Sequence, residues 1–350
     1  EQLLTDLNSR LHEAGDPAEL LAFKPFPESF LPPGLHEAKG EVKLVSPRFT
    51  GRIDCNWQLT SYSGLMASFH EAPELVRPDP ERPDYDEGTD RDAGRESGPA
   101  APPVQNAFTF PKGAAAGTCL HAVLEQISFI DPGGHEAVIT AELARAGFDR
   151  SWITVVGEWM RDVLQTPFPA GKTGEAAGSL SAVQEKDRVN EMAFSFPLAG
   201  MQLRSFHQVL EASSCPPLPD RLTDRHEVLE GLMVGFIDLV FSFEGRYYLA
   251  DYKSNYLGDS PADYQQEQLQ AAMLEHRYDL QYLIYTLALH RFLGTRIREY
   301  NYDEHFGGVL YLFLRGMHPD YAAGTGILSA RPPLPLIEEL DQLVGLGKTP

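Results

Sequence analysis

Apolar residues recur every three or four positions in several segments of the chain, which is the period of a helix with one buried face. The helices predicted in this way span residues 1–24, 117–127, 149–168, 262–276, 278–294 and 335–346. Short apolar or alternating runs predict strands instead, at residues 57–62, 190–198 and 307–316. The last run is apolar on both faces, which is typical of a strand in the middle of a sheet.

The most apolar part of the sequence, residues 231–255, predicts a β-hairpin with a tight turn at residues 244–246. Charged residues nevertheless interrupt both of its strands, at Asp238, Asp251 and Lys253. Counting outward from the turn places Asp238 and Asp251 almost opposite each other on neighbouring strands. Lys253 lies two residues after Asp251, so both side chains leave the same face of their strand.

Two carboxylates that face each other in a buried hairpin repel, and burial is costly unless a cation or a proton intervenes. A hard divalent cation such as Mg²⁺ prefers carboxylate oxygens and keeps water ligands free for a phosphate substrate. Lys253 is placed to hold a metal-bound water or to neutralise charge in the transition state. The alternative is a surface hairpin with an Asp–Lys pair of little energetic value. The apolar neighbours of the three residues favour the buried site.

The order of predicted elements indicates an α/β (α+β) fold with a sheet flanked by helices. Residues 71–106 are rich in Pro, Gly and acidic residues, and we expect an acidic, Pro-rich flexible linker there. This divides the chain into a tail at residues 1–70 and a main domain at residues 107–350.

The formal net charge of −21 argues against a protein that binds nucleic acid through its own basic surface. The three cysteines are far apart in the sequence, which argues against disulfides and zinc and favours a reducing cytoplasm. No transmembrane segment, signal peptide or initiator Met is seen, and the phosphate-binding motif of ATPases is absent. We therefore expect a fragment of a longer protein.

Four motifs together resemble the RecB-type nucleases of the PD-(D/E)xK superfamily. They are GxxxH at Gly117–His121, GFID at Gly235–Asp238, DYKSN at Asp251–Asn255, and Q-x-x-x-Y at Gln281 and Tyr285. The segments 57–65 and 305–316 are also similar to that family, and the resemblance is strongest over residues 107–348. It implies a restriction-endonuclease-like core with a central mixed β-sheet flanked by helices.

The resemblance also assigns roles to individual residues. It implies that His121, Asp238, Asp251 and the backbone carbonyl of Tyr252 are metal ligands. Lys253 would be the catalytic lysine, with Asp238, Asp251 and Glu191 as catalytic acidic residues, and Gln281 and Tyr285 as accessory residues that contact DNA. The metal would be Mg²⁺, one or two ions per site, and a histidine ligand hints that Mn²⁺ is also accepted.

Simpler interpretations remain for some of these side chains. A lone helical histidine such as His121 is often a core residue, and Glu191 precedes a strand at a position that can be solvated. Tyr285 could belong only to the core of its helix. Glu125, one helical turn after His121, could support the site or simply face solvent.

The function implied is a Mg²⁺-dependent exodeoxyribonuclease acting mainly on single-stranded DNA fed by a helicase. It would work in the bacterial cytoplasm, in a RecBCD-type complex in double-strand break repair and recombination. Its partners would be DNA, RecC-like and RecD-like subunits and the missing helicase region. The alternatives are a non-catalytic, nuclease-like scaffold that docks partner subunits, or an AddAB-type recombination nuclease. Three scattered cysteines exclude the iron–sulfur version of the latter, which needs four.

Overall fold

The computed structural model describes residues 57–69, 104–170, 176–213, 216 and 228–345, all of which belong to one compact unit. The predicted helix at residues 1–24 and most of the predicted linker at 71–106 lie outside the described residues. Within the part that is described, no helix is both long enough and apolar enough to cross a lipid bilayer.

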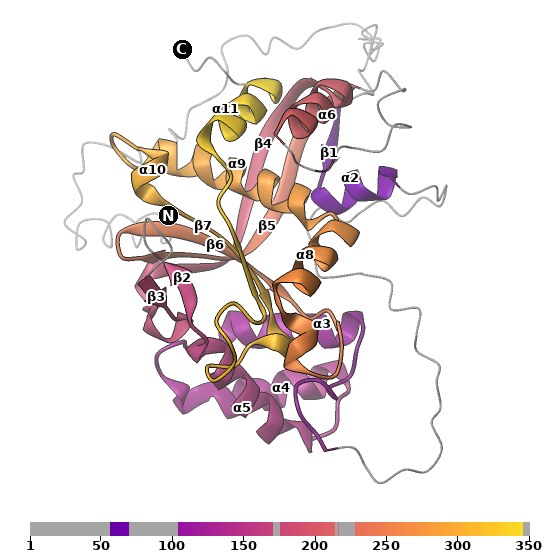
Figure 1. The fold of residues 1–350 in the computed structure, drawn as a ribbon, viewed down its shortest axis with the longest axis vertical. Coiled ribbons are helices and arrows are strands. Elements are labelled where there is room, and N and C mark those ends of the chain that lie inside the picture. Colours follow the sequence, from indigo (N-terminus) through magenta and orange to yellow (C-terminus); the bar gives the residue numbers. More distant parts are fainter. Residues whose placement is uncertain (1–56, 70–103, 171–175, 214–215, 217–227, 346–350) are drawn as a thin grey trace, which may run out of the picture. The chain divides into compact units, whose positions relative to one another are not determined.

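A six-stranded mixed sheet forms the centre of the described fold (Figure 1). Its strands are β1 (Trp57–Thr60), β4 (Arg188–Gln202), β5 (Val228–Phe243), β6 (Arg246–Lys253), β7 (Phe306–Phe313) and β8 (Ile327–Ala330). The pairs β4–β5, β5–β6 and β7–β8 are antiparallel, whereas β1–β5 and β6–β7 are parallel. A separate small hairpin joins β2 (Phe168–Ala170) and β3 (Ala176–Gly178). The predicted mixed sheet is confirmed.

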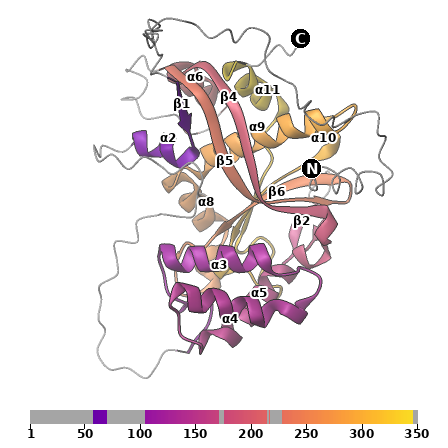
Figure 2. The same cartoon turned by 180° about the vertical axis from the view of Figure 1, so that it is seen from behind.

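Helices pack on the sheet in two groups, which stay apart in both views (Figures 1 and 2). One group holds α3 (Ala114–Gln126), α4 (His135–Ala146) and α5 (Trp152–Gln165). The other holds α2 (Tyr62–Phe69), α6 (Leu203–Ala212), α8 (Gln266–Glu275), α9 (Tyr278–Arg296) and α11 (Leu334–Leu343). The short helix α10 (Tyr302–His305) leads directly into β7. Sequence periodicity alone did not identify α4, α6 or β8.

Alternating side chains of the central strands supply two separate hydrophobic cores. In β6, Leu249 belongs to the core on the α9 side, whereas Tyr248 and Ala250 belong to the core on the α3 side. Strand β7 alternates in the same way, with Val309 on the α9 side and Leu310 on the α3 side. Burial on both faces explains why these strands read as continuous apolar runs rather than alternating ones.

The segment before the predicted linker packs onto this sheet. Strand β1 pairs in parallel with residues 230–233 of β5, while β6 pairs with the other end of that strand. Leu65 of α2 is buried in the core on the α9 side, and the Tyr62 hydroxyl donates to the His276 carbonyl at 2.8 Å. The last part of the predicted tail is therefore integral to the sheet.

Helix α3 begins earlier than its sequence indicated. Thr118 was the expected N-cap, but the helix starts at Ala114, after Gly113 in a left-handed conformation with φ 94°. The alanines at positions 114–116 favour the helical state strongly enough to add a turn before Gly117. Thr118 is an exposed residue inside the helix.

Arg315 ties three segments together beside the end of β6. Its side chain is only 1% exposed and donates to the carbonyls of Ser254, Ala107, Phe110 and Pro111 at 2.7–3.0 Å. These carbonyls would be buried without partners if the guanidinium group were lost, and each such loss is costly. Arg315 therefore fixes the chain that enters α3 against the chain that leaves β6.

We expect Arg315→Ala to lower the free energy of unfolding by roughly 3 kcal/mol or more, because several buried carbonyls lose their donor at once. The melting temperature should fall by about 2–4 °C for each kcal/mol. Thermal unfolding followed by circular dichroism measures this. The exposed Arg298 gives a matched control, since Arg298→Ala should unfold like the wild type. Equal melting temperatures for the two variants would contradict the role given to Arg315.

Candidate metal centre

Strand register places three carboxylates in one row across three strands. The β4–β5 register is the same on both sides of Glu191, which puts this residue directly opposite Asp238. The β5–β6 pairing extends to Leu239 and Ala250, so the next pair outward is Asp238 and Asp251. The sequence-based prediction that Asp238 faces Asp251 agrees with this register. Asp238 thus has an acidic neighbour on each side.

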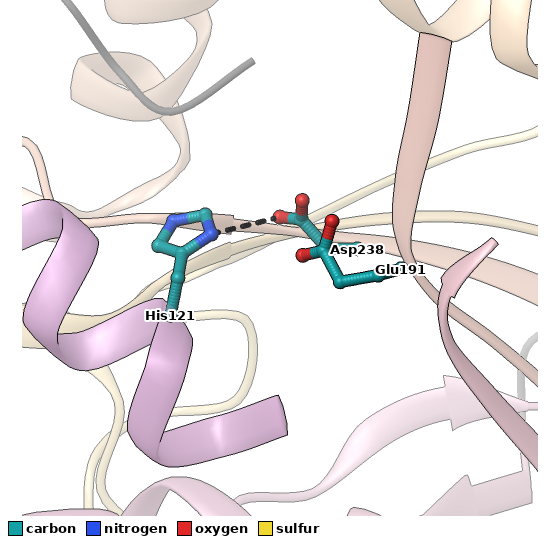
Figure 3. Close-up of side chains that lie close together, drawn as sticks. All are labelled: His121, Glu191 and Asp238. Carbon is teal, nitrogen blue, oxygen red and sulfur yellow. Dashed lines mark ion pairs between the residues drawn. The ribbon is translucent and has the colours of Figure 1, made fainter. Parts of the chain in front are cut away.

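His121 reaches this row from helix α3, on the other side of the site (Figure 3). Its Nδ1 lies 3.5 Å from Oδ2 of Asp238, and its ring stands edge-on to the ring of Tyr252. Among the described residues, His121, Glu191 and Asp238 each offer a ligand atom within 4.8 Å of the others. One nitrogen and two carboxylate oxygens form a donor set that suits a divalent cation with a preference for oxygen.

Gly117 explains how α3 comes close enough to deliver His121. A Cβ atom at position 117 would lie 2.9 Å from the Ser254 Oγ, which is closer than carbon normally approaches. Ser254 directly follows Lys253, so this contact lies at the end of β6. The glycine of the GxxxH motif therefore permits the close approach of helix and strand one turn before His121.

Glu191 is held in an unusual backbone conformation with its charge partly buried. Its φ of 48° lies in the left-handed region, which L-residues rarely adopt. Within the described part of the chain, its buried Oε2 has no hydrogen-bond partner. Burial and the nearby charges of Asp238, Glu125 and Asp251 raise the pKa of Glu191 to about 8. A carboxylate in this situation fits a bound cation, because the cation would supply the missing partner and the missing charge.

Asp251 lies next to the three-ligand group and is paired with Lys253. The Lys253 Nζ lies 2.7 Å from Asp251 Oδ2, and both residues are 2% exposed. The same ammonium group lies 3.9 Å from the ring centroid of Tyr278 and 5.6 Å from that of Tyr311. The predicted role of Asp251 as a metal ligand stays a prediction.

The backbone of Tyr252 also reaches the site. Its amide donates to Asp238 Oδ2 at 2.7 Å, which orients that carboxylate. Its ring is on the α3 side of the sheet, where complete burial raises the pKa of the phenol and keeps it neutral. Coordination of a metal by the Tyr252 carbonyl stays a prediction.

Gln281 and Tyr285 lie in the core rather than at an exposed surface. They are 1% and 2% exposed, and the Gln281 amide donates to the Tyr285 hydroxyl at 3.1 Å. Gln281 Oε1 in turn accepts a hydrogen bond from the Tyr311 hydroxyl at 3.0 Å. The predicted contact of these side chains with DNA stays a prediction, whereas their observed contacts lead to the tyrosines around Lys253.

The outer part of the site includes groups that the sequence analysis left open or did not predict. Glu125 is exposed, which agrees with the alternative that it faces solvent, and its charge contributes to the raised pKa of Glu191. Tyr278 and Tyr311 were not predicted as part of the site. Tyr311 could have been found from the parallel pairing of β6 with β7, which places it opposite Asp251. That pairing is not visible in the sequence.

Comparison with known proteins agrees with this geometry. Residues 101–324 match the family model of the PD-(D/E)XK nuclease superfamily. The chain is 40% identical over 294 residues to the RecBCD enzyme subunit RecB of Escherichia coli (strain K12), covering 82% of this chain and 23% of the relative. Identity to the RecB subunit of Haemophilus influenzae is 33% over 299 residues, covering 84% of this chain and 24% of the relative.

The RecB subunit of Mycobacterium tuberculosis is 35% identical over 338 residues, covering 86% of this chain and 30% of that protein. This chain therefore spans 23–30% of the length of these three relatives. The family match includes α3, the β5–β6 hairpin and the start of α9, and with them every residue that the structure gathers at the site. The chain belongs to the PD-(D/E)XK nuclease superfamily.

Proposed function

We propose that this chain hydrolyses phosphodiester bonds in DNA with the help of a divalent cation, for which Mg²⁺ is the natural choice and Mn²⁺ a second one. The observation that supports this most directly is the convergence of His121, Glu191 and Asp238 beside a buried Asp251–Lys253 pair. A purely structural ion pair would not need three further ligand groups next to it.

The side chains divide into those that would hold the cation and those that would act on the phosphate. His121, Glu191 and Asp238 would hold it, with Asp251 and the Tyr252 carbonyl next to them. When bound, a divalent cation polarises the scissile phosphate and lowers the pKa of an attacking water. The Tyr252 amide keeps the Asp238 carboxylate oriented for this role.

Lys253 would stabilise the negative charge that develops on the phosphate oxygens during hydrolysis. Its ammonium group is already fixed by Asp251 and by neighbouring aromatic rings, so little reorganisation is needed when the substrate binds. These groups address phosphate oxygens, which every nucleotide presents alike, so cleavage should depend little on base sequence.

The RecB relatives suggest the setting in which this activity operates. We propose that the substrate is chiefly single-stranded DNA delivered by a helicase, within a RecBCD-type complex that has RecC-like and RecD-like partners and acts in DNA repair. The net charge of −21 is consistent with delivery by partners, because such a chain attracts DNA only weakly by itself.

Degradation of linear single-stranded DNA with Mg²⁺ tests the activity. Lys253→Ala and Asp238→Asn should each lower the rate by roughly 100-fold or more, because the first removes a group that stabilises transition-state charge and the second a ligand of the cation. The exposed Lys186 supplies a matched control, and Lys186→Ala should cut like the wild type. Undiminished cleavage by both site variants would contradict the assignment of Lys253 and Asp238 to the nuclease site. No cleavage by any protein would favour the non-catalytic scaffold or a requirement for partner subunits.

Glu191→Gln should raise the melting temperature of the metal-free protein and abolish its further rise with Mg²⁺ or Mn²⁺. Removing this charge relieves its repulsion with Asp238, and 1 kcal/mol corresponds to about 2–4 °C. The wild type should instead gain stability with metal, because the cation binds only the folded state. Differential scanning fluorimetry with EDTA and with added metal measures both effects.

Glu299 provides the control for that experiment. It also has a positive φ, of 59°, but it is exposed and lies outside the metal cluster. Glu299→Gln should leave both the metal-free stability and the response to metal as in the wild type. A Glu191→Gln protein that still gains stability with metal would remove Glu191 from the proposed ligands.

Gly117→Ala should lower nuclease activity by roughly 10-fold or more without lowering stability, because small displacements of catalytic groups are costly. The added methyl group pushes α3 away from Ser254, while alanine itself favours the helix over glycine. Ser254→Ala removes the opposing hydroxyl and should restore activity in the double variant. Cleavage rates and melting temperatures of both variants test this. Full activity of Gly117→Ala alone would show that the hydroxyl simply rotates away.

A further inference from the structure

The Lys253 ammonium group contacts both a carboxylate and an aromatic ring. Its Nζ lies 2.7 Å from Asp251 Oδ2. It also lies 3.9 Å from the ring centroid of Tyr278, and Tyr311 is further away at 5.6 Å. Distances below about 6 Å allow a ring face to attract a cation, and burial strengthens that attraction. The ammonium group is therefore held from two sides.

Tyr278 is itself held through its ring and its backbone. Its ring stacks on His276 and on Tyr311, with centroids 5.2 and 5.7 Å apart. Its carbonyl accepts a hydrogen bond from the Tyr311 hydroxyl at 3.1 Å. It is the first residue of α9, and it is 5% exposed. Such a ring cannot turn away from Lys253 without disturbing its neighbours.

The Q-x-x-x-Y residues form the layer behind this arrangement. Tyr285 accepts from Gln281, and Gln281 accepts from the Tyr311 hydroxyl that also bonds the Tyr278 carbonyl. This chain of hydrogen bonds joins the start of α9 to β7. Because β7 pairs with β6, Tyr311 and the Tyr278 bonded to it are both connected to the strand that carries Lys253.

We propose that Tyr278 is a positioning residue, whose ring face fixes the Lys253 ammonium group for action on the scissile phosphate. The inference rests on the function proposed above for Lys253. Tyr278 acts through Lys253 and is not itself one of the proposed metal ligands. The part that contacts the ammonium group is the ring face, whereas the Tyr278 hydroxyl lies 3.4 Å from the Asn255 side chain.

The test compares two substitutions of Tyr278 in the 350-residue chain. Tyr278→Leu removes the aromatic face and should lower kcat on single-stranded DNA by roughly 10- to 100-fold, with KM little changed. Tyr278→Phe keeps the face and should retain most of the activity. Tyr248→Leu is the matched control, because Tyr248 is an equally buried tyrosine on β6 that packs on the opposite side of the sheet. The Tyr248→Leu variant should have a lower melting temperature but an unchanged kcat.

A second readout does not depend on activity. The ring current of Tyr278 should shift the Cε protons of Lys253 upfield in protein labelled with ¹³C at the lysine ε position, and Lys253→Arg identifies the signal. The shifted signal should persist in Tyr278→Phe and disappear in Tyr278→Leu. A signal that is unchanged in Tyr278→Leu would overturn the proposal.

The combined outcomes separate this inference from the proposed function. If Lys253→Ala is inactive while Tyr278→Leu keeps its kcat, the nuclease assignment stands and the role of Tyr278 is wrong. If the wild type shows no cleavage by itself, the rates do not test Tyr278, and the Lys253 signal alone decides whether Tyr278 holds the lysine. A loss of kcat in Tyr278→Phe equal to that in Tyr278→Leu would also overturn the proposal, because the ring face would then not be the active feature.

Discussion

Repulsion between carboxylates on adjacent strands is the constraint on which the arrangement around the β5–β6 hairpin depends. Two unit charges about 4 Å apart interact by roughly 4 kcal/mol at an effective dielectric constant of about 20, a large fraction of the stability of a typical domain. Glu191, Asp238 and Asp251 occupy one row across β4, β5 and β6. The Tyr252 amide and Lys253 offset part of that repulsion. The raised pKa of Glu191 shows where compensation is incomplete and where a cation fits.

The site draws its groups from both layers that cover the sheet. His121 comes from α3 on one side, whereas Lys253 contacts the tyrosines of the opposite core. Geometry at the site therefore depends on how α3 is fastened to the end of β6. Gly117 sets the distance of that approach, and Arg315 joins residues 107–111 to Ser254. A glycine and an arginine that are not themselves proposed ligands thus control where the ligands meet.

Sequence reasoning was most successful where local spacing determines geometry. The short turn of the hairpin fixes which residues face each other, so the position of Asp238 opposite Asp251 followed from counting. Glu191 was harder to place, because a long connection that includes α6, rather than a short turn, joins β4 to β5, so counting does not set its partner. The tyrosines near Lys253 come from α9 and β7, and only the sheet topology brings them to β6. The helix start expected at Thr118 was wrong, because the alanines before Thr118 favour the helical state and extend α3 back to Ala114.

The contacts behind Lys253 continue into the segment that precedes the predicted linker. His276 stacks on Tyr278, and its carbonyl accepts the hydroxyl of Tyr62 at the start of α2. Strand β1, immediately before α2, extends the same sheet through β5. A continuous series of packed groups therefore runs from Lys253 through two aromatic rings to α2. The two ends of that series lie on either side of the predicted linker in the sequence. The folded unit that positions the lysine therefore includes β1 and α2 as well as the segment after the linker.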